Sequence, residues 1–284
     1  MASHLTLSPD SSIDLHMHTT YSDGHWPAEQ LLDYLANQGF DLIAVTDHDR
    51  VDQVASIQTL GAQRNLHVLA GVEMSTDWHG QMGDLLCYGF DPHDNALGPL
   101  TTQVVRLQLE NTLAVHEKLL QQGYVFPRQD EILAKNGNQL IRPGDNIALL
   151  RAHGYTPDYA TALKLITEAG YSSSKVSMAE AVEATHRSGG VCLIAHPGRR
   201  EAHFTFYSTT LLDEVRSEIP LDGIEVYHPT HTPELVETYL AYARQHKLLQ
   251  STGSDSHSLP NRMPIKYRAE LSRALLERVG IQMQ

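Results

Sequence analysis

The sequence predicts an α/β fold: a distorted barrel of parallel strands with a helical insertion. Three observations support this prediction. Short apolar segments alternate with amphipathic ones along most of the 284 residues, as they do when strands and helices alternate around a parallel sheet. Several apolar segments lack a polar face, which is typical of strands covered on both sides. The stretch 97–175 breaks the rhythm and contains no convincing strand.

The strands and helices of the predicted barrel can be placed by their boundaries. One helix is expected between Pro27, which favours a first helical turn, and Gly39, which favours a helix end. Another is introduced by Thr232 and Pro233. The strands are expected at 12–16, 41–46, 67–73, 84–90, 191–195, 223–227 and 248–252. The helices are expected at 27–38, 51–64, 177–188, 232–246 and 265–279.

The interrupting stretch is expected to be helical. It has helical patterns at 99–122, 144–153 and 157–169, separated by glycine and proline clusters. The expected organisation is a barrel built from residues 12–96 and 176–284, with residues 97–175 as a helical insertion that caps the active site.

The charge of the chain argues against one class of partner. With 34 acidic and 21 basic residues the formal charge is -13, whereas stable binding of duplex nucleic acid needs lysine and arginine to neutralise phosphates. A small anion can still bind, because the local field governs binding in a pocket that holds divalent cations.

Nothing in the sequence indicates export or a membrane partner. The N-terminal residues show no basic segment followed by an apolar stretch, and no run approaches the length of a membrane span. Cys87 and Cys192 lie inside apolar segments, where buried free thiols are more common than a disulfide. We therefore expect a cytoplasmic protein, whose oligomeric state the sequence does not indicate.

Side chains of the types that bind metals follow the predicted strands. His16 and His18 lie two positions apart, so alternation along the strand points both imidazoles to one side. Other predicted strands are also followed by polar residues of these types, at Asp47-His48, Glu73, His196 and Asp255-Ser256-His257. A solvated surface residue explains Glu73 better when it is taken alone. Recurrence at four or five strand ends, where parallel α/β folds keep their sites, instead predicts a site for several divalent cations.

This ordered series resembles the polymerase and histidinol phosphatase family of metal-dependent phosphoesterases. The resemblance extends over residues 13–258 and rests on His-x-His with a following Asp23, Thr-Asp-His, a strand-end Glu73, Ala-His-Pro-Gly-Arg and Gly-Ser-Asp-x-His. The family implies a distorted seven-stranded (β/α) barrel with two or three cations, commonly manganese, iron or zinc. The most similar branch removes phosphate from nucleoside 3′,5′-bisphosphates, trims short RNA from its 5′ end and carries a helical insertion.

The resemblance also implies how the ligands are shared. One cation would be held by His16, His18, Glu73 and Asp255, and a second by Asp23, His48 and His257. Glu73 would bridge to a third cation, which His196 also binds. The branch has a histidine as a further ligand of this third cation, eleven residues after the bridging glutamate, and here that position is Asp84. Aspartate there favours manganese or magnesium, and His79 is the alternative ligand if its loop folds inward.

A phosphate substrate also needs cationic side chains from the protein. Arg199, three residues after His196, resembles the phosphate-contacting arginine of the family, and its planar guanidinium suits two phosphate oxygens. Arg142 and Lys175 are further candidates for substrate binding, although charged loop residues are usually only solvated. His228 follows a predicted strand and is a candidate proton donor or a partner that orients a ligand.

We therefore predict a metal-dependent phosphoesterase. A hydroxide bridging two cations would attack phosphorus, and Arg199 would neutralise the charge that grows on the phosphoryl oxygens. The catalytic acid for the leaving group would be His228 or a metal-bound water, and Asp14 and Asp47 would orient imidazoles. The expected cofactors are two or three divalent ions, Mn²⁺ ahead of Fe²⁺ or Zn²⁺. The expected substrate is a small phosphorylated molecule, either a nucleotide such as a 3′,5′-bisphosphate or the 5′ end of a short oligonucleotide.

Two other functions are compatible with parts of the pattern. Related barrels with histidine-rich sites include amidohydrolases that cleave C–N bonds, but their usual two-metal pattern has no place for Asp23, His48 and His257 and no task for Arg199. A non-catalytic metal-binding module is the other alternative. Such modules often lose ligands, whereas this chain keeps eight of the nine family ligands.

Overall fold

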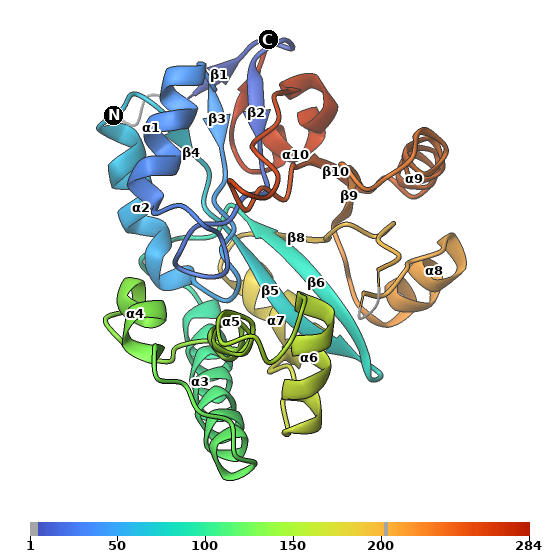
Figure 1. Ribbon diagram of the computed structural model, residues 1–284. Coiled ribbons are helices and arrows are strands. Elements are labelled where there is room, and N and C mark those ends of the chain that lie inside the picture. The colour runs from blue at the N-terminus through green and yellow to red at the C-terminus, as the bar shows by residue number, and fades with distance from the viewer. Residues whose placement is uncertain (1–4, 202–203) are drawn as a thin grey trace. The chain divides into compact units, whose positions relative to one another are not determined.

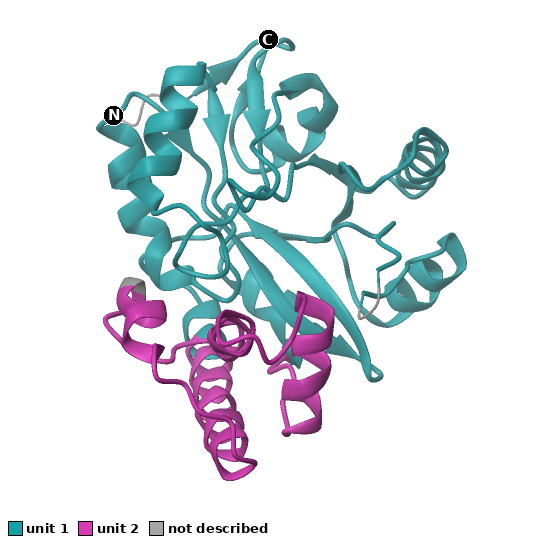
Figure 2. Cartoon of the chain, in the orientation of Figure 1, with its two compact units in different colours: residues 1–101, 176–284 teal, residues 102–175 magenta. Residues whose placement is uncertain are grey.

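The computed structural model describes residues 5–201 and 204–284, without the side chain of Lys135. It separates into unit 1, residues 1–101 and 176–284, and unit 2, residues 102–175 (Figure 2). The strands described in unit 1 (Figure 1) are β1 Thr6–Leu7, β2 Ser12–Asp14, β3 Leu42–Ile43, β4 His67–Val68, β5 Gly71–Trp78, β6 Gln81–Tyr88, β7 Val176–Ser177, β8 Val191–Ile194, β9 Gly223–Tyr227, β10 Leu249–Thr252, β11 Tyr267–Arg268 and β12 Gln282–Met283.

Helices follow most of these strands, as the sequence predicts. Those of unit 1 are α1 Ala28–Gln38, α2 Val54–Ala62, α7 Met178–Arg187, α8 Thr209–Glu218, α9 Pro233–His246 and α10 Arg273–Arg278, with 3-10 turns at Val51–Gln53 and Ala269–Ser272. Helix α1 ends where the sequence indicates, because Gly39 adopts a left-handed conformation (φ 71°) and its amide donates to the carbonyl of Ala36.

Most strands of unit 1 follow one another around a ring, and β1 and β12 form a separate two-stranded sheet. One sheet has the order β10-β9-β8-β6-β5-β7 and another the order β11-β2-β3-β4. Backbone hydrogen bonds join these sheets at two places. The Leu15 amide donates to Thr252 after β2 (3.2 Å), and the Glu73 amide donates to Thr46 after β3 (3.1 Å). The predicted α/β class with parallel strands is thereby confirmed, in an arrangement typical of a distorted barrel.

The interior of this ring is apolar. Ile13, Leu15, Leu86 and Leu193 are fully buried, and the buried Tyr88 donates its hydroxyl to the Leu15 carbonyl at 2.7 Å. Burying one such leucine stabilises the fold by about 1.5–3 kcal/mol. The core therefore fixes β2, β6 and β8 against one another, and with them the polar residues at their ends.

The expectation that the sheet is parallel throughout is wrong for β5 and β6. These strands form an antiparallel hairpin in which Gly71 faces Tyr88 and Trp78 faces Gln81, and β6 is also antiparallel to β8. The two-residue turn, His79-Gly80, has positive φ at both positions (50° and 80°), as a tight hairpin requires. Histidine is a weaker hairpin signal than asparagine or aspartate, so the sequence alone favours separate parallel strands.

Other elements also differ from the expectation. The predicted helix over 265–279 is wrong in its first part, because Tyr267–Arg268 pairs as a strand with β2 and the helix begins at Arg273. Helix α8 is absent from the predicted elements. It buries only Leu212 and Val215, so its apolar stripe is too short to distinguish from a loop.

Unit 2 is helical in the part of the chain that the structure describes. Its elements are α3 Leu97–Gln121, which begins in unit 1, α4 Gln129–Leu133, a 3-10 turn at Ala134–Asn136, α5 Pro143–Ala152 and α6 Tyr159–Glu168. Leu119, Leu133, Leu150 and Ile166 are fully buried in one apolar cluster. Among the described residues, no helix is both long and apolar enough to cross a membrane.

Candidate metal centre

Most predicted ligands lie just beyond strand ends, whereas Glu73 and Asp84 lie within β5 and β6. Backbone contacts hold several of these segments side by side. Met17, between His16 and His18, bridges to Ser256, and His48 bridges to Glu73. These contacts continue the parallel ladder past β2 and β3. They explain how residues more than 200 positions apart in the sequence reach one place.

The first group contains His16, His18, Glu73 and Asp255, all buried, with ligand atoms within 4.8 Å of one another. Oε2 of Glu73 lies 3.0 Å from Nε2 of His16 and 3.2 Å from Nε2 of His18. Oδ1 of Asp255 lies 3.3 Å from Nε2 of His18. The structure thus brings together the four residues expected at the first cation.

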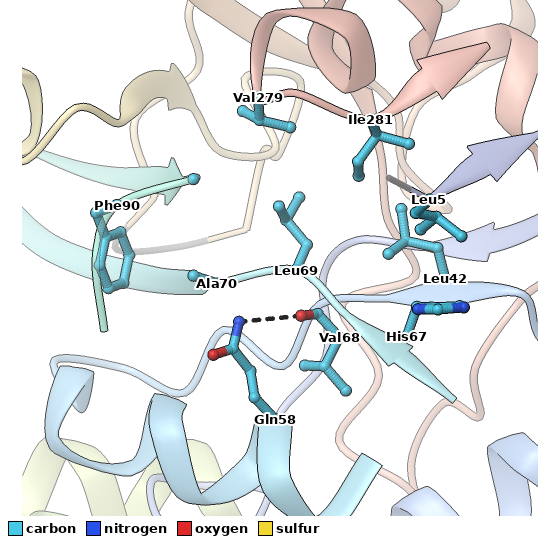
Figure 3. A pocket seen from close by; sticks show the side chains of 11 residues that line it. Leu5, Leu42, Gln58, His67, Val68, Leu69, Ala70, Phe90, Val279 and Ile281 are labelled. Carbon is cyan, nitrogen blue, oxygen red and sulfur yellow. Dashed lines mark hydrogen bonds between the residues drawn. The ribbon is translucent and has the colours of Figure 1, made fainter. Parts of the chain in front are cut away.

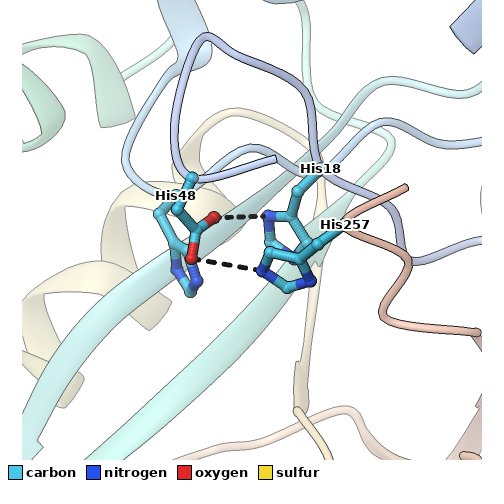
Figure 4. A group of neighbouring side chains, drawn as sticks. His18, His48 and His257 are labelled. Atoms are coloured by element: carbon cyan, nitrogen blue, oxygen red, sulfur yellow. Dashed lines mark hydrogen bonds and ion pairs between the residues drawn. The ribbon is translucent and has the colours of Figure 1, made fainter. Parts of the chain in front are cut away.

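The second group contains Asp23, His48 and His257, as the resemblance implies, together with His18. Figure 4 shows the imidazoles of His18, His48 and His257 close together. The centroid of the His18 ring lies 4.3 Å from that of His257 and 4.8 Å from that of His48. Oδ2 of Asp23 lies 3.1 Å from Nε2 of His257. His18 is therefore shared by both groups.

The third group contains His48, Glu73 and Asp84. The predicted ligand His196 is outside this group but lies near two of its members. Nε2 of His196 lies 3.0 Å from Oε1 of Glu73 and 3.8 Å from Oδ2 of Asp84. His79 is exposed at the hairpin turn and is paired with Glu218 at 2.7 Å. The structure accordingly places Asp84 in this group and His79 outside it.

The residues present fit divalent cations. Both ring nitrogens of His18, Nδ1 of His48 and Oδ1 of Asp84 are buried and form no hydrogen bond among the described residues. Buried polar atoms of this kind are costly unless something binds them. The donors are imidazole nitrogens and carboxylate oxygens without a thiolate, a set that suits manganese, iron or zinc.

The close approach of buried imidazoles and carboxylates shifts the pKa values of these groups. Burial by itself lowers the pKa of His18, but the carboxylates of Asp255 and Glu73, 3.3 and 3.2 Å from its Nε2, raise that pKa to about 10. Burial raises the pKa of Asp84, and the charge of Glu73 raises it further. Without cations, protons on the imidazoles therefore balance part of the carboxylate charge, and a cation must displace them.

Glu225 is a functional candidate that the sequence reasoning missed. It is fully buried, and Oε1 lies 3.0 Å from Nδ1 of His16 while Oε2 accepts the backbone amide of His196 at 2.7 Å. A carboxylate on Nδ1 holds the proton there and leaves Nε2 of His16 free for a cation. An acid in the middle of an apolar strand is the signal that could have found it.

Neither Asp14 nor Asp47 forms a hydrogen bond with an imidazole of the described residues, so the expectation that they orient imidazoles is wrong. Asp14 accepts the backbone amides of Ser254 and Ile265, both at 2.9 Å, and burial raises its pKa to about 6. Asp47 accepts the amide of Thr19 at 2.7 Å. Both carboxylates hold loop backbone in place, because strand ends that curve inward leave amides without ladder partners.

Close packing and local strain accompany the ligands. His196 and Asp255 have positive φ (29° and 50°), a conformation that non-glycine residues rarely adopt and that tends to occur at functional sites. A Cβ added at Gly253 would overlap Cβ of His16 and Oε1 of Glu225. Glycine is therefore required at that position.

The candidate catalytic and substrate-binding residues fall in both units. Nη1 of Arg199 lies 3.3 Å from Oδ2 of Asp255. His228 is buried in unit 1, and that burial lowers its pKa to about 4. Arg142 precedes α5 in unit 2, with Nε 3.8 Å from Asp145, and Lys175 is the last residue of that unit.

A pocket of about 280 Å³ lies elsewhere in unit 1 (Figure 3). It is lined mainly by apolar side chains, among them Leu5, Leu42, Leu69 and Ile281, and Gln58 on its wall donates to the Val68 carbonyl at 3.1 Å. None of the predicted ligands lines it. We assign it no part in the chemistry.

Clustered imidazoles and carboxylates at the strand ends of an α/β ring define a metal-dependent hydrolase centre. The chain belongs to the PHP domain family, whose model matches residues 14–279. The resemblance to polymerase and histidinol phosphatase proteins is thereby confirmed.

Three similar proteins have the names of phosphoesterases. A phosphoribosyl 1,2-cyclic phosphate 1,2-diphosphodiesterase of Eggerthella lenta is 27% identical over 88% of this chain and 96% of its own length. A 3′,5′-nucleoside bisphosphate phosphatase of Chromobacterium violaceum is 28% identical over 87% of this chain and 88% of its own. A 5′-3′ exoribonuclease of Haemophilus influenzae is 25% identical over 86% and 89%. The chain is therefore a metal-dependent hydrolase of phosphoric esters.

Solved structures share the fold. A Bifidobacterium adolescentis protein inferred to be a metal-dependent phosphoesterase superposes with a TM-score of 0.79 at 24% identity, covering 94% of this chain and 96% of its own. A Chromobacterium violaceum protein described as an amidohydrolase, with bound sulfate and no metal, gives a TM-score of 0.77 at 25% identity and the same coverage.

Proposed function

We propose that the chain hydrolyses a phosphate ester of a nucleoside 3′,5′-bisphosphate, or at the 5′ end of a short RNA, with manganese as the resident cation. The observation that carries the proposal is that two of the candidate ligand groups share Glu73, and that Arg199 contacts one of these groups through its ion pair with Asp255. The relatives from Chromobacterium violaceum and Haemophilus influenzae act on substrates of these kinds and support the choice.

Each set of residues has its own task in this reaction. The imidazoles and carboxylates hold the cations, and Glu225 keeps Nε2 of His16 available by accepting a hydrogen bond from Nδ1. Arg199 offers positive charge where charge grows on the phosphoryl oxygens. When bound, the cations would supply Lewis acidity toward the phosphoryl group and lower the pKa of an attacking water.

A second anionic group of the substrate would bind to Arg142 and Lys175. Nη1 of Arg142 supports this part of the proposal, because it is buried and forms no hydrogen bond with any described residue. A phosphate oxygen would satisfy it. We place the reaction in the cytoplasm, since the free thiols of Cys87 and Cys192 suit a reducing compartment.

A hydrolysis screen with added manganese, in which products are followed by phosphate release and by chromatography, tests the proposal. The substrates are a nucleoside 3′,5′-bisphosphate, the matched 3′- and 5′-monophosphates, 5′-phosphorylated short RNA, a ribosyl 1,2-cyclic phosphate and an amide. We expect the bisphosphate or the short RNA to be hydrolysed with the highest kcat/KM. Asp255→Asn should abolish turnover, and the exposed Asp10→Asn should not change it. Cleavage of the cyclic phosphate alone would refute the substrate, and cleavage of the amide alone would refute the reaction.

A further inference from the structure

The two carboxylate oxygens of Asp255 face different surroundings. Oδ1 lies among imidazoles, 3.3 Å from Nε2 of His18 and 3.6 Å from Nε2 of His16. Oδ2 faces three nitrogen donors from the segments after β8, β9 and β10: Arg199 Nη1 at 3.3 Å, His228 Nε2 at 3.5 Å and Arg262 Nη1 at 3.8 Å. These distances exceed the usual range of roughly 2.7–3.2 Å, so one oxygen does not satisfy all three donors.

The proton on His228 can be placed from its contacts. The backbone N–H of Thr230 donates to Nδ1 at 3.2 Å, and the Thr230 hydroxyl lies 2.8 Å from the same atom. Nδ1 is therefore an acceptor, and a neutral ring carries its proton on Nε2. His228 is 3% exposed, and among the described residues its Nε2 has no hydrogen-bond partner. A buried N–H is thus aimed at Asp255 without an adequate acceptor.

Both arginines are held in place by other groups. The guanidinium of Arg199 stacks on the ring of Phe204, 3.5 Å from its centroid, and its Nε lies 3.4 Å from Glu201. Nη1 of Arg262 donates to the Ser254 carbonyl at 2.7 Å. Donors fixed in this way need little reorganisation when an anion arrives.

We propose that Arg199, His228 and Arg262 form an anion pocket that binds non-bridging oxygens of the substrate phosphoryl group, with His228 as a neutral hydrogen-bond donor rather than a proton donor. A phosphoryl group has several oxygens and can satisfy three donors that one carboxylate oxygen cannot. The pocket deepens the proposed function and rests on it for the identity of the anion. Arg262 thereby joins the residues that touch the substrate.

The tautomer of His228 is the first test. Two-bond ¹H–¹⁵N correlation spectra of the metal-free protein, labelled with ¹⁵N-histidine and assigned through His228→Gln, report which ring nitrogen carries the proton. We expect Nε2 to carry it and Nδ1 to be bare, both in the wild type and in Thr230→Val, which keeps the backbone donor. A proton on Nδ1 would overturn the role assigned to His228.

Binding of inorganic phosphate to the metal-free protein, followed by calorimetry, is the second test. Arg262→Gln and His228→Leu should each weaken binding roughly ten- to hundredfold, the effect of one hydrogen bond to a charged group. His228→Gln restores an N–H near the position of Nε2 and should retain most of the affinity. The matched control is Arg268→Gln, which removes an arginine paired with Asp10 on the surface. Absence of phosphate binding, or equal binding by all variants, would contradict the pocket.

Kinetics with two leaving groups separates this pocket from the proposed function. His228→Leu should slow an aryl phosphate and an alkyl phosphate by the same factor, because non-bridging oxygens are common to both. Selective slowing of the alkyl ester would identify His228 as the proton donor and refute our assignment. If phosphate binding depends on Arg262 and His228 but no nucleotide is hydrolysed, the pocket stands and the proposed substrate fails.

Discussion

Glu225→Gln is the most specific perturbation of the metal centre, because it replaces a single carboxylate oxygen with an NH₂ group in a fully buried side chain. The backbone N–H of His196, at 2.7 Å, needs an acceptor, so the amide oxygen should stay on that side. The amide NH₂ then faces Nδ1 of His16, at the position 3.0 Å away where Oε1 accepts a hydrogen bond from Nδ1 in the native protein. His16 must respond by moving its proton to Nε2, the atom that a cation needs.

The magnitude follows from the loss of one correctly oriented imidazole. Removing a partner that orients a metal-bound histidine typically costs about 10- to 100-fold in metal affinity, or about 1.4–2.7 kcal/mol. Competition with a fluorescent chelator measures manganese affinity, and thermal unfolding shows whether the fold is kept. Glu237→Gln, an exposed change of the same chemistry in α9, is the matched control. Wild-type manganese affinity in Glu225→Gln would refute the argument about the His16 tautomer.

Three other perturbations have defined outcomes. Arg199→Ala should lower kcat/KM by an amount equivalent to about 2–4 kcal/mol of transition-state stabilisation, at unchanged metal content. Unchanged kinetics would mean that Arg199 is only a solvated surface residue. Elemental analysis of Asp84→Ala should show one cation fewer than the wild type. Asp84→His should shift the metal preference of the third group toward zinc. Full metal content in Asp84→Ala would show that Asp84 is not a ligand. Burial lowers the pKa of His18, but the neighbouring carboxylates of Asp255 and Glu73 outweigh it and raise that pKa to about 10. Manganese binding near pH 7 should therefore release protons and tighten as pH rises. Calorimetry in buffers of different ionisation enthalpy measures that release, and a count of zero would contradict it.

The strand-end ligands could be predicted because the signal is local and repeated. His16 and His18 alternate along one strand, and Asp255 and His257 repeat the spacing after another. Parallel strands bring their carboxyl ends to one side, so the pattern alone indicates a shared site. Asp84 needed the family spacing as well, since it lies within a strand that the structure shows to be antiparallel.

The parts that sequence reasoning missed depend on contacts between distant segments. Glu225 contacts His16 across 209 positions, and no pattern within β9 shows where its carboxylate points. Arg262 reaches Asp255 from a loop whose course the sequence does not define. The β5–β6 hairpin was hidden by its His79-Gly80 turn, which uses an uncommon residue for positive φ.

Removal and return of manganese tests the central claim, that the cation groups sharing Glu73 and His18 carry phosphoester hydrolysis. The protein is stripped with a chelator, its metal content is verified by elemental analysis, and phosphate release from the preferred nucleotide is followed as manganese is added back. We expect no turnover in the stripped protein and full recovery as the sites fill, because the ligand set consists of imidazoles and carboxylates that need a cation to act. Full activity in the metal-free protein would contradict the account.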